Sequence, residues 1–387
     1  MKRIFLHTIS LILLVSIFAG CSTEKNTRAS RTFHNVTSHY NVYFNANESV
    51  KEGLLTIDER IEDDFTRLLP IYKESDPSAA KMVKSDMDYA VIKCSKLIEM
   101  HSITKKPKRK RKRTRKYQEF ASQEEFNKWI DDSYLLMGKA YYYQQNYFAA
   151  IENFSYVVRK YPDEESADEA QVWLIKAYTE LERFIEANEV IQAIQAYENF
   201  PKKFERELAI ATANYYVKQQ EYGEAIKMLD IAIKKTTWRR NKARLQYIIA
   251  QLHQELGQND MASEAFRKVT RMNPGYKMAF NARINSAGVF SGEGNTADLI
   301  KELNKMLRDK KNIEFRDQIY YALGNVYFRE GEREIAKDNY KSSVSSSYKN
   351  QYQRALSSIT LADLYFDDFN YRGSQSYYDS EIGRAHV

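Results

Sequence analysis

The sequence is poor in the residues that build loops, cross-links and membrane spans. Its 387 residues include only 6 prolines and 13 glycines, which argues against a loop-rich all-β protein, a collagenous chain or a low-complexity chain. Two cysteines cannot form a disulfide framework. Beyond residue 20 no apolar run approaches the length of about 18 residues that a membrane-spanning helix needs. The 29 tyrosines and the aromatic content of 13% exclude intrinsic disorder and favour a soluble, mostly helical protein.

Signatures of catalysis and of cofactor binding are missing as well. The chain has no HExxH, GxGxxG, GxxxxGK[ST] or GxSxG motif. His34 and His39 are five residues apart, but two imidazoles without a third ligand make a weak metal site. The pairs Asp131-Asp132 and Glu164-Glu165 stand at expected helix starts, where carboxylates usually complement the helix dipole. We therefore predict no enzymatic activity, no catalytic residue, no cofactor, no metal and no small-molecule substrate.

The N-terminus has the features of an export signal. Residues 1–20 begin with Met1-Lys2-Arg3, continue with an apolar stretch and end in small residues before Cys21. The ending Phe18-Ala19-Gly20-Cys21 resembles the signals of bacterial lipoproteins. The resemblance implies a lipidated Cys21, and two or three acyl chains anchor a protein stably in a membrane. Because no acidic cluster follows Cys21, we expect a lipid-anchored outer-membrane protein that faces the periplasm. The alternative is an ordinary secretory signal with an incidental cysteine.

One short run carries the positive charge. The net charge is +7, and ten of the twelve residues from Lys105 to Lys116 are lysine or arginine. Without these ten, 49 basic residues stand against 52 acidic ones, so the chain lacks the spread of positive charge typical of a nucleic-acid-binding fold. Because like charges repel and Pro107 disfavours a helix, we expect residues 105–118 to form an exposed loop, the basic loop.

Two interpretations of the basic loop remain open. It is either a solvated insertion without a dedicated partner, or an electrostatic contact with anionic lipid or an acidic protein, where each basic residue contributes about 1 kcal/mol. In the second case, binding is expected to weaken at high salt. Nucleic acid is not an expected partner, since the leader directs the chain away from the genome. The central residues of the loop are Lys108, Arg109, Lys110, Arg111, Lys112 and Arg113.

Three columns of residues repeat along the chain with a period of 37 or 38 residues. The first column, aromatic apart from one histidine, is Tyr141, Tyr178, Tyr216, His253, Phe290, Tyr327 and Tyr365. The second, nine residues later and mostly alanine, is Ala150, Ala187, Ala225, Ala262, Leu299, Ala336 and Ser374. The third, four residues further on and large, is Phe154, Ile191, Leu229, Phe266, Leu303, Tyr340 and Tyr378. Such periods are typical of solenoids built from stacked units.

The columns resemble the tetratricopeptide repeat family. The best copy runs from Asp131 to Asp163 and has Tyr134, Met137-Gly138, Tyr141, Ala150, Phe154 and Pro162 at the offsets of the family. The resemblance implies pairs of antiparallel helices, in which small residues such as Gly138 and Ala150 allow close approach. No pair buries its apolar face alone, so the pairs stack. We predict an all-α, right-handed superhelical solenoid of seven copies over residues 119–380, preceded by one extra helix pair.

The segment before the repeats is expected to form a helical hairpin, residues 48–104. Apolar residues recur every three or four positions from Glu48 to Tyr72, which predicts one helix, and a second is predicted from Ala79 to Met100. Cys94 lies on the apolar face of the second helix and is expected to pack in the core. Residues 21–47 are expected to form a mostly irregular lead from the lipid anchor. Residues 381–387 lack the repeat pattern and match a translated sequencing adapter, so we expect a non-native tail.

The inner face of the first helices is the expected partner-binding surface. Aromatic and amide side chains with a few cations face inward in this register, which suits an extended peptide or protein segment. For Tyr142 and Phe328 the alternative is simple packing against adjacent helices. The cations are too scattered for the carboxylate clamp of chaperone-binding tetratricopeptide proteins. The predicted partner-binding residues are Tyr142, Lys176, Asn214, Tyr247, Tyr321, Asn325, Phe328 and Arg329.

A more specific resemblance lies near the N-terminus. Residues 33–37 (FHNVT) lead to residues 40–49 (YNVYFNANES), and the basic loop and residues 129–140 (WIDDSYLLMGKA) follow. This arrangement resembles the N-terminal part of the SprE (PorW) family of gliding-motility lipoproteins of the Bacteroidetes. The resemblance implies an accessory component of the type IX secretion system that connects the periplasmic machinery to the outer-membrane translocon. Other secretion-machinery proteins would then be its partners. Since members of that family are much longer, the sequence is expected to be a fragment.

Two other functions remain open on the sequence. One is a general tetratricopeptide lipoprotein of outer-membrane protein assembly, which would co-purify with the insertase barrel. The other is an enzyme-like or glycan-binding periplasmic protein, which would bind an oligosaccharide saturably. Generic repeat lipoproteins lack the stretch from His34 to Ser49, so a scaffold in secretion and gliding is the leading hypothesis.

Overall fold

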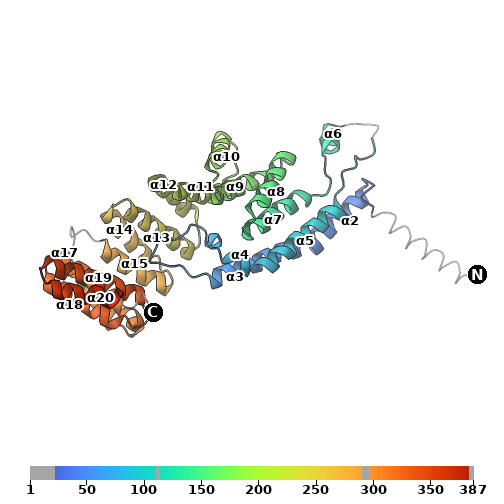
Figure 1. Ribbon diagram of the computed structural model, residues 1–387. Helices are drawn as coiled ribbons and strands as arrows, with labels where there is room; N and C mark the ends of the chain where they lie inside the picture. The colour runs from blue at the N-terminus through green and yellow to red at the C-terminus, as the bar shows by residue number, and fades with distance from the viewer. Residues whose placement is uncertain (1–21, 110–113, 290–295, 383–387) are drawn as a thin grey trace, which may run out of the picture. The chain divides into compact units, whose positions relative to one another are not determined.

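The computed structural model describes residues 22–109, 114–289 and 296–382, and within these ranges the chain is helical without any β-strand (Figure 1). The chain packs as two units. Unit 1 comprises residues 1–64 and 70–232, and unit 2 comprises residues 65–69 and 233–387. Among the described helices, none combines the length and the apolar character needed to cross a membrane.

The N-terminal part of unit 1 is more helical than the sequence indicates. Residues 21–47 were expected to be mostly irregular, but α2 (Arg28–Thr37), a π-helix (Ser38–Tyr43) and α3 (Phe44–Arg60) follow one another without a break. The side chain of Thr27 caps α2 by accepting a hydrogen bond from the backbone N–H of Ser30. The second expected helix is present as α4 (Ala79–Met82) and α5 (Lys84–His101).

The helix expected to reach Tyr72 ends at Arg60 instead. Ile61 has an extended backbone (φ −88°, ψ 109°), and the chain stays irregular up to Tyr72. Two features explain the error: the acidic residues 62–64 oppose the negative pole of a helix C-terminus, and Pro70 disfavours helical backbone at Leu69. A short 3-10 turn, Lys73–Ser75, follows. We call residues 65–76 the strap.

The seven repeats of the sequence are seven helical hairpins, which confirms the predicted fold class. The short α6 (Arg115–Ser122) precedes them, so a helix begins inside the segment expected to be a loop. The first three hairpins are α7 (Ile130–Tyr143) with α8 (Tyr147–Lys160), α9 (Glu165–Glu180) with α10 (Phe184–Ala196), and α11 (Glu205–Lys218) with α12 (Tyr222–Lys235). The others are α13 (Arg239–Glu255) with α14 (Asn259–Arg271), α15 (Tyr276–Gly288) with α16 (Thr296–Arg308), α17 (Arg316–Arg329) with α18 (Arg333–Ser346), and α19 (Gln351–Asp367) with α20 (Tyr371–Ile382).

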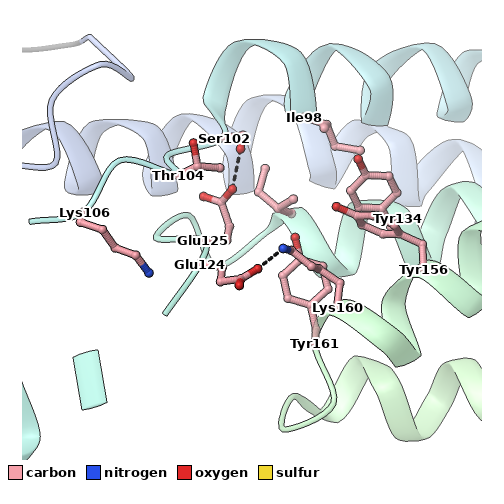
Figure 2. A pocket seen from close by; sticks show the side chains of 11 residues that line it. Ile98, Ser102, Thr104, Lys106, Glu124, Glu125, Tyr134, Tyr156, Lys160 and Tyr161 are labelled. Carbon is pink, nitrogen blue, oxygen red and sulfur yellow. Dashed lines mark hydrogen bonds and ion pairs between the residues drawn. The ribbon is translucent and has the colours of Figure 1, made fainter. Parts of the chain in front are cut away.

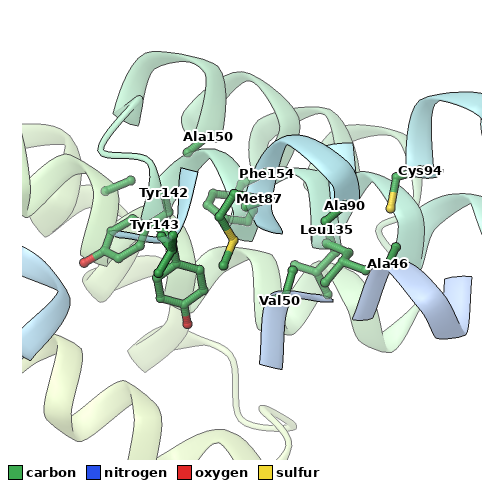
Figure 3. Packing of buried hydrophobic residues seen from close by; sticks show 14 of the residues in the cluster. Ala46, Val50, Met87, Ala90, Cys94, Leu135, Tyr142, Tyr143, Ala150 and Phe154 are labelled. Atoms are coloured by element: carbon green, nitrogen blue, oxygen red, sulfur yellow. The ribbon is translucent and has the colours of Figure 1, made fainter. Parts of the chain in front are cut away.

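The columns of the sequence form the core of the hairpins. Every residue of the second column is buried, and every residue of the third column from Phe154 to Tyr340 is at most 3% exposed. In unit 1 the N-terminal helices join this core, because Val50 of α3 and Met87 of α5 pack in one cluster with Leu135 of α7 (Figure 3). Cys94 lies in the same cluster and is fully buried, and burial raises the pKa of its thiol to about 12. The thiol is therefore a packing group, as expected.

The hairpin turns share one backbone conformation. In six of them a residue has a positive φ between 57° and 83°, and the next backbone N–H donates to the carbonyl of the first-column residue over 2.9 Å. This is the Schellman ending of a helix, which favours glycine at the positive φ. The residues with positive φ are Gln145, Glu182, Gln220, Gly257, Gly331 and Phe369.

Replacing Glu182 by glycine is expected to stabilise the chain by about 1 kcal/mol, because an L-residue in left-handed backbone costs about that much. Equilibrium unfolding in urea measures the change. The reverse substitution at the equivalent turn, Gly257→Glu, is the matched control and should destabilise by a similar amount. If both substitutions change the free energy of unfolding in the same direction, the argument from backbone conformation is wrong.

Candidate partner-binding surfaces

The strap covers the inner face of α9 in unit 1 through a cage around Lys176. The ammonium group of Lys176 lies 3.8 Å from the ring centroid of Trp173 and 4.8 Å from that of Tyr142. From the strap, the ring of Tyr72 approaches it to 4.1 Å and the carboxylate of Glu74 to 3.4 Å. Burial lowers the pKa of Lys176, and Glu74 opposes this effect. The cage thus holds a buried cation by cation–π contacts and one ion pair.

Hydrogen bonds hold residues 74–76 of the strap in unit 1. The side-chain amide of Gln145 donates to the carbonyl oxygens of Glu74 (3.1 Å) and Asp76 (2.8 Å). The hydroxyl of Ser75 donates to the carboxylate of Glu180 over 2.9 Å. Asn214 donates to the same carboxylate over 3.1 Å. The chain itself therefore occupies the side chains that line the inner face of α9.

The second part of the strap lies in unit 2 and is held by one amide side chain. Gln251 of α13 donates to the carbonyl of Arg67 over 2.7 Å and accepts the backbone N–H of Leu69 over 3.0 Å. The ring of Phe65 packs against Tyr247 with 5.1 Å between centroids. Leu69 is buried. Gln251 thus binds the non-helical backbone of the strap through both ends of its amide.

The eight residues predicted to bind a partner fall into two groups. Tyr142, Lys176, Asn214 and Tyr247 are buried and contact their own unit, so a partner would reach them only after rearrangement. Among the other four, Phe328 is 40% exposed. Arg329 donates to the carbonyl of Ala287 over 3.2 Å, and burial lowers its pKa. The binding role of all eight stays a prediction.

Tyr321 and Asn325 border a cavity of about 240 Å³ in unit 2. Residues 65–68 of the strap form one of its walls, and helices α13, α15, α17 and α19 supply the others. Eight of its nineteen lining residues are asparagine or glutamine, and only Arg67 and Glu255 are charged. The amide groups make this cavity suited to hydrogen bonding with uncharged polar groups such as a peptide backbone.

A second cavity, of about 330 Å³, lies in unit 1 between the end of α5 and α8, and no motif of the sequence pointed to it (Figure 2). Tyr134, Tyr156 and Tyr161 line it together with Lys160, which is paired with Glu124. Tyr134 and Tyr156 contact each other, with 4.4 Å between their centroids. The rings therefore pack mainly on one another.

Glu125, which also lines the cavity in Figure 2, has a structural role. One of its carboxylate oxygens accepts the backbone N–H groups of Ile103 (2.7 Å), Phe126 (2.9 Å) and Asn127 (2.8 Å). The other accepts the hydroxyl of Ser102 over 2.5 Å. Both oxygens therefore serve to close the loop between α5 and α7, and Glu125 is not an acid or base poised for chemistry.

The stretch that carries the resemblance to gliding lipoproteins ties α2 to this same loop. His34 and His101 share a hydrogen bond of 2.8 Å between their Nδ1 atoms, and both are buried. Asn35 accepts the backbone N–H of Lys128 over 2.9 Å. Ser38 accepts a hydrogen bond from Asn127 over 2.8 Å. These motif residues hold the N-terminal helices against the loop that precedes the repeats.

Acidification is expected to loosen this contact. Burial and the neighbouring His34 lower the pKa of His101, so its contribution to stability is complete above its ordinary pKa of about 6.5 and is lost as the pH falls through the lowered value. We expect the unfolding temperature to drop between about pH 7 and pH 5, and amide exchange in α2 to rise. His101→Gln should flatten this pH dependence, whereas the control His253→Gln should keep it. A slope unchanged by His101→Gln would refute the assignment.

Several predicted features lie outside the described residues. These are the leader and Cys21, the basic-loop residues Lys110, Arg111, Lys112 and Arg113, the repeat aromatic Phe290, and residues 383–387. Of the loop, Lys108 and Arg109 are described and exposed. Elsewhere in the described chain, no group of three or more His, Cys, Asp or Glu side chains could hold a metal ion. His39, one of the two histidines weighed as ligands, stacks on Trp129 at 4.0 Å.

The described helices define a helical-repeat protein whose inner faces are partly occupied by its own strap. Residues 243–276 and 317–350 match a family model described as tetratricopeptide repeat, and residues 132–164 match a second model with the same description. These three segments, α13–α14, α17–α18 and α7–α8, are tetratricopeptide repeats. No curated protein matches the chain.

Solved structures resemble the chain at low identity. The apo form of the quorum sensor NprR from B. thuringiensis is 14% identical, with a TM-score of 0.40, and the match covers 99% of this chain and 94% of NprR. A tetratricopeptide repeat protein from Parabacteroides merdae is 14% identical, with a TM-score of 0.35, and the match covers 81% and 97%. The pilF structure from Pseudomonas aeruginosa is 15% identical, with a TM-score of 0.35, and the match covers 64% of this chain and 88% of that one.

Proposed function

We propose that this chain is a scaffold that binds segments of other proteins on the inner face of its repeats. Stacked tetratricopeptide hairpins present long concave surfaces of this kind. The observation that carries the proposal is the pair of hydrogen bonds from Gln251 to the strap, since they show a non-helical backbone bound by an inner-face amide. The absence of any catalytic motif in the sequence favours a scaffold over an enzyme.

We further propose that the scaffold is anchored by Cys21 in the outer membrane, faces the periplasm and serves type IX secretion and gliding motility. Two features of the sequence support this: the leader that ends in a lipoprotein-like signal, and the stretch from His34 to Ser49 that resembles the SprE (PorW) family. In this function the scaffold would link the periplasmic machinery to the outer-membrane translocon. Its partners would be other secretion-machinery proteins.

A deletion strain tests the cellular role. We expect loss of type IX cargo secretion and of gliding, restored by the wild-type gene but not by Cys21→Ser. A strain that still secretes and glides would reject the role. Affinity purification of the tagged native protein from gently solubilised envelopes identifies the partners: the translocon or its periplasmic ring supports the proposal, whereas the insertase barrel points to outer-membrane protein assembly.

A further inference from the structure

The site that holds the strap in unit 2 recurs two repeats further along the chain. Tyr247 and Gln251 stand six and two residues before the first-column residue of α13. In α17, Tyr321 and Asn325 stand at the same two distances before the first-column residue. Since the hairpins share one geometry, the two pairs hold equivalent places on the inner face. The intervening α15 has Ile284 and Gly288 at these places, so it does not repeat the pair.

The first pair shows what such a pair binds. The aromatic ring of Phe65 packs on Tyr247, and Gln251 binds the backbone at Arg67 and Leu69. The first pair therefore binds one aromatic side chain and the main chain of a non-helical segment two to four residues later. The side chain of Gln251 contacts only main-chain atoms of the strap in these bonds, so this part of the recognition is independent of sequence.

The second pair has the groups for the same task. Tyr321 is only half-buried, and the oxygen of Asn325 accepts the hydroxyl of Tyr340 over 2.8 Å, which leaves its NH₂ group to donate to a carbonyl. Both residues line the cavity of about 240 Å³ that begins at the strap. Tyr352, 64% exposed, adds a second aromatic ring to the same cavity. The lining is rich in amides and nearly uncharged, which selects backbone over charged groups.

We infer that Tyr321 and Asn325 form a docking site for a non-helical segment of a partner protein that carries an aromatic residue, bound in the way in which Tyr247 and Gln251 bind the strap. This inference rests on the proposed function and specifies it. The aromatic ring of the partner packs on Tyr321, and a backbone carbonyl a few residues away accepts the amide of Asn325. The strap fills the first site in cis, so the second site is the one offered to a partner.

A peptide with the strap's own sequence tests the inference, since it carries the phenylalanine and the backbone groups that the site is expected to bind. The probe is a fluorescein-labelled synthetic peptide of residues 63–72, titrated with the purified full chain and followed by fluorescence anisotropy. We expect saturable binding that Asn325→Ala and Tyr321→Leu each weaken about tenfold, the loss of roughly one aromatic or hydrogen-bonded contact. Asn339→Ala on α18 removes an amide away from the cavity and is the matched control, expected to change nothing.

Changes in the peptide keep the test independent of protein folding. A peptide in which the phenylalanine is replaced by alanine should bind about tenfold more weakly to the wild-type chain. Absence of binding, or binding indifferent to both α17 substitutions, would overturn the inference. The peptide test uses purified components, so its outcome is separable from that of the cellular test. If the chain co-purifies with the translocon but does not bind the peptide, the docking site is rejected and the proposed function is retained.

Discussion

Replacing Lys176 by methionine is expected to release the strap from α9 and to destabilise the chain by about 3 kcal/mol. The side chains of Lys176 and Glu74 are only 9% and 16% exposed, and removal of one member leaves the other charge buried without its partner. Methionine keeps most of the apolar stem between Trp173 and Tyr142, so the loss reports the charge rather than a cavity. Chemical denaturation measures the change in free energy, and amide exchange at residues 72–76 measures release of the strap.

The double variant Lys176→Met/Glu74→Leu separates the ion pair from the rest of the cage. Because burial already disfavours the charged form of Lys176, an apolar pair of similar volume should recover most of the lost stability. Exposed ion pairs contribute little, so Lys341→Met, which breaks a pair with Asp338 on α18, is the control and should change stability by less than about 1 kcal/mol. If the double variant is as unstable as Lys176→Met alone, the loss comes from the missing ion pair itself and not from the unpaired buried charge of Glu74.

The repeats could be predicted from the sequence because one physical requirement is repeated seven times. Each hairpin must bury a small residue and a large one at fixed spacing, so Ala150 and Phe154 recur as a pattern that needs no tertiary knowledge. The same logic placed Cys94 in the core. The period also extends to the turns, where Gln145 and Glu182 adopt a left-handed backbone. A glycine at these positions would have made that conformation easier to predict from the sequence.

The strap could not be predicted, because its contacts are unique and lie far apart in the sequence. Residues 61–72 have apolar spacing that also suits a helix. The acidic residues 62–64 and Pro70 disfavour that helix, but the path of the strap is set by contacts with Lys176 and Gln251, more than a hundred residues away. The inner-face predictions therefore identified the residues that face inward, such as Lys176 and Tyr247, but not what covers them. The histidine pair was missed for the same reason, since His34 and His101 are 67 residues apart.

Substitution of Gly138 by alanine is the second large effect that we expect, with a loss of about 2 kcal/mol. A Cβ atom at Gly138 would lie 2.7 Å from Cδ1 and 2.9 Å from Cζ of Phe154, with Cε1 closer still. Phe154 is fully buried and stacks on Trp173, so its ring has no room to withdraw. Overpacking of this kind costs about 1–3 kcal/mol, which outweighs the gain of up to about 1 kcal/mol in helix propensity.

Two comparisons show whether the ring of Phe154 causes this loss. Gly223→Ala in α12 is the same substitution at a site where a Cβ meets nothing within 4 Å, so only the propensity gain should remain and the chain should become slightly more stable. Phe154→Leu placed together with Gly138→Ala should cost less than the two single changes combined, because the smaller side chain vacates the space that the new methyl group needs. Additive losses, measured by urea denaturation, would mean that the glycine is required for a backbone reason instead. Since α7 also supplies Tyr142 to the cage around Lys176, a displaced α7–α8 hairpin should raise amide exchange in the strap as well.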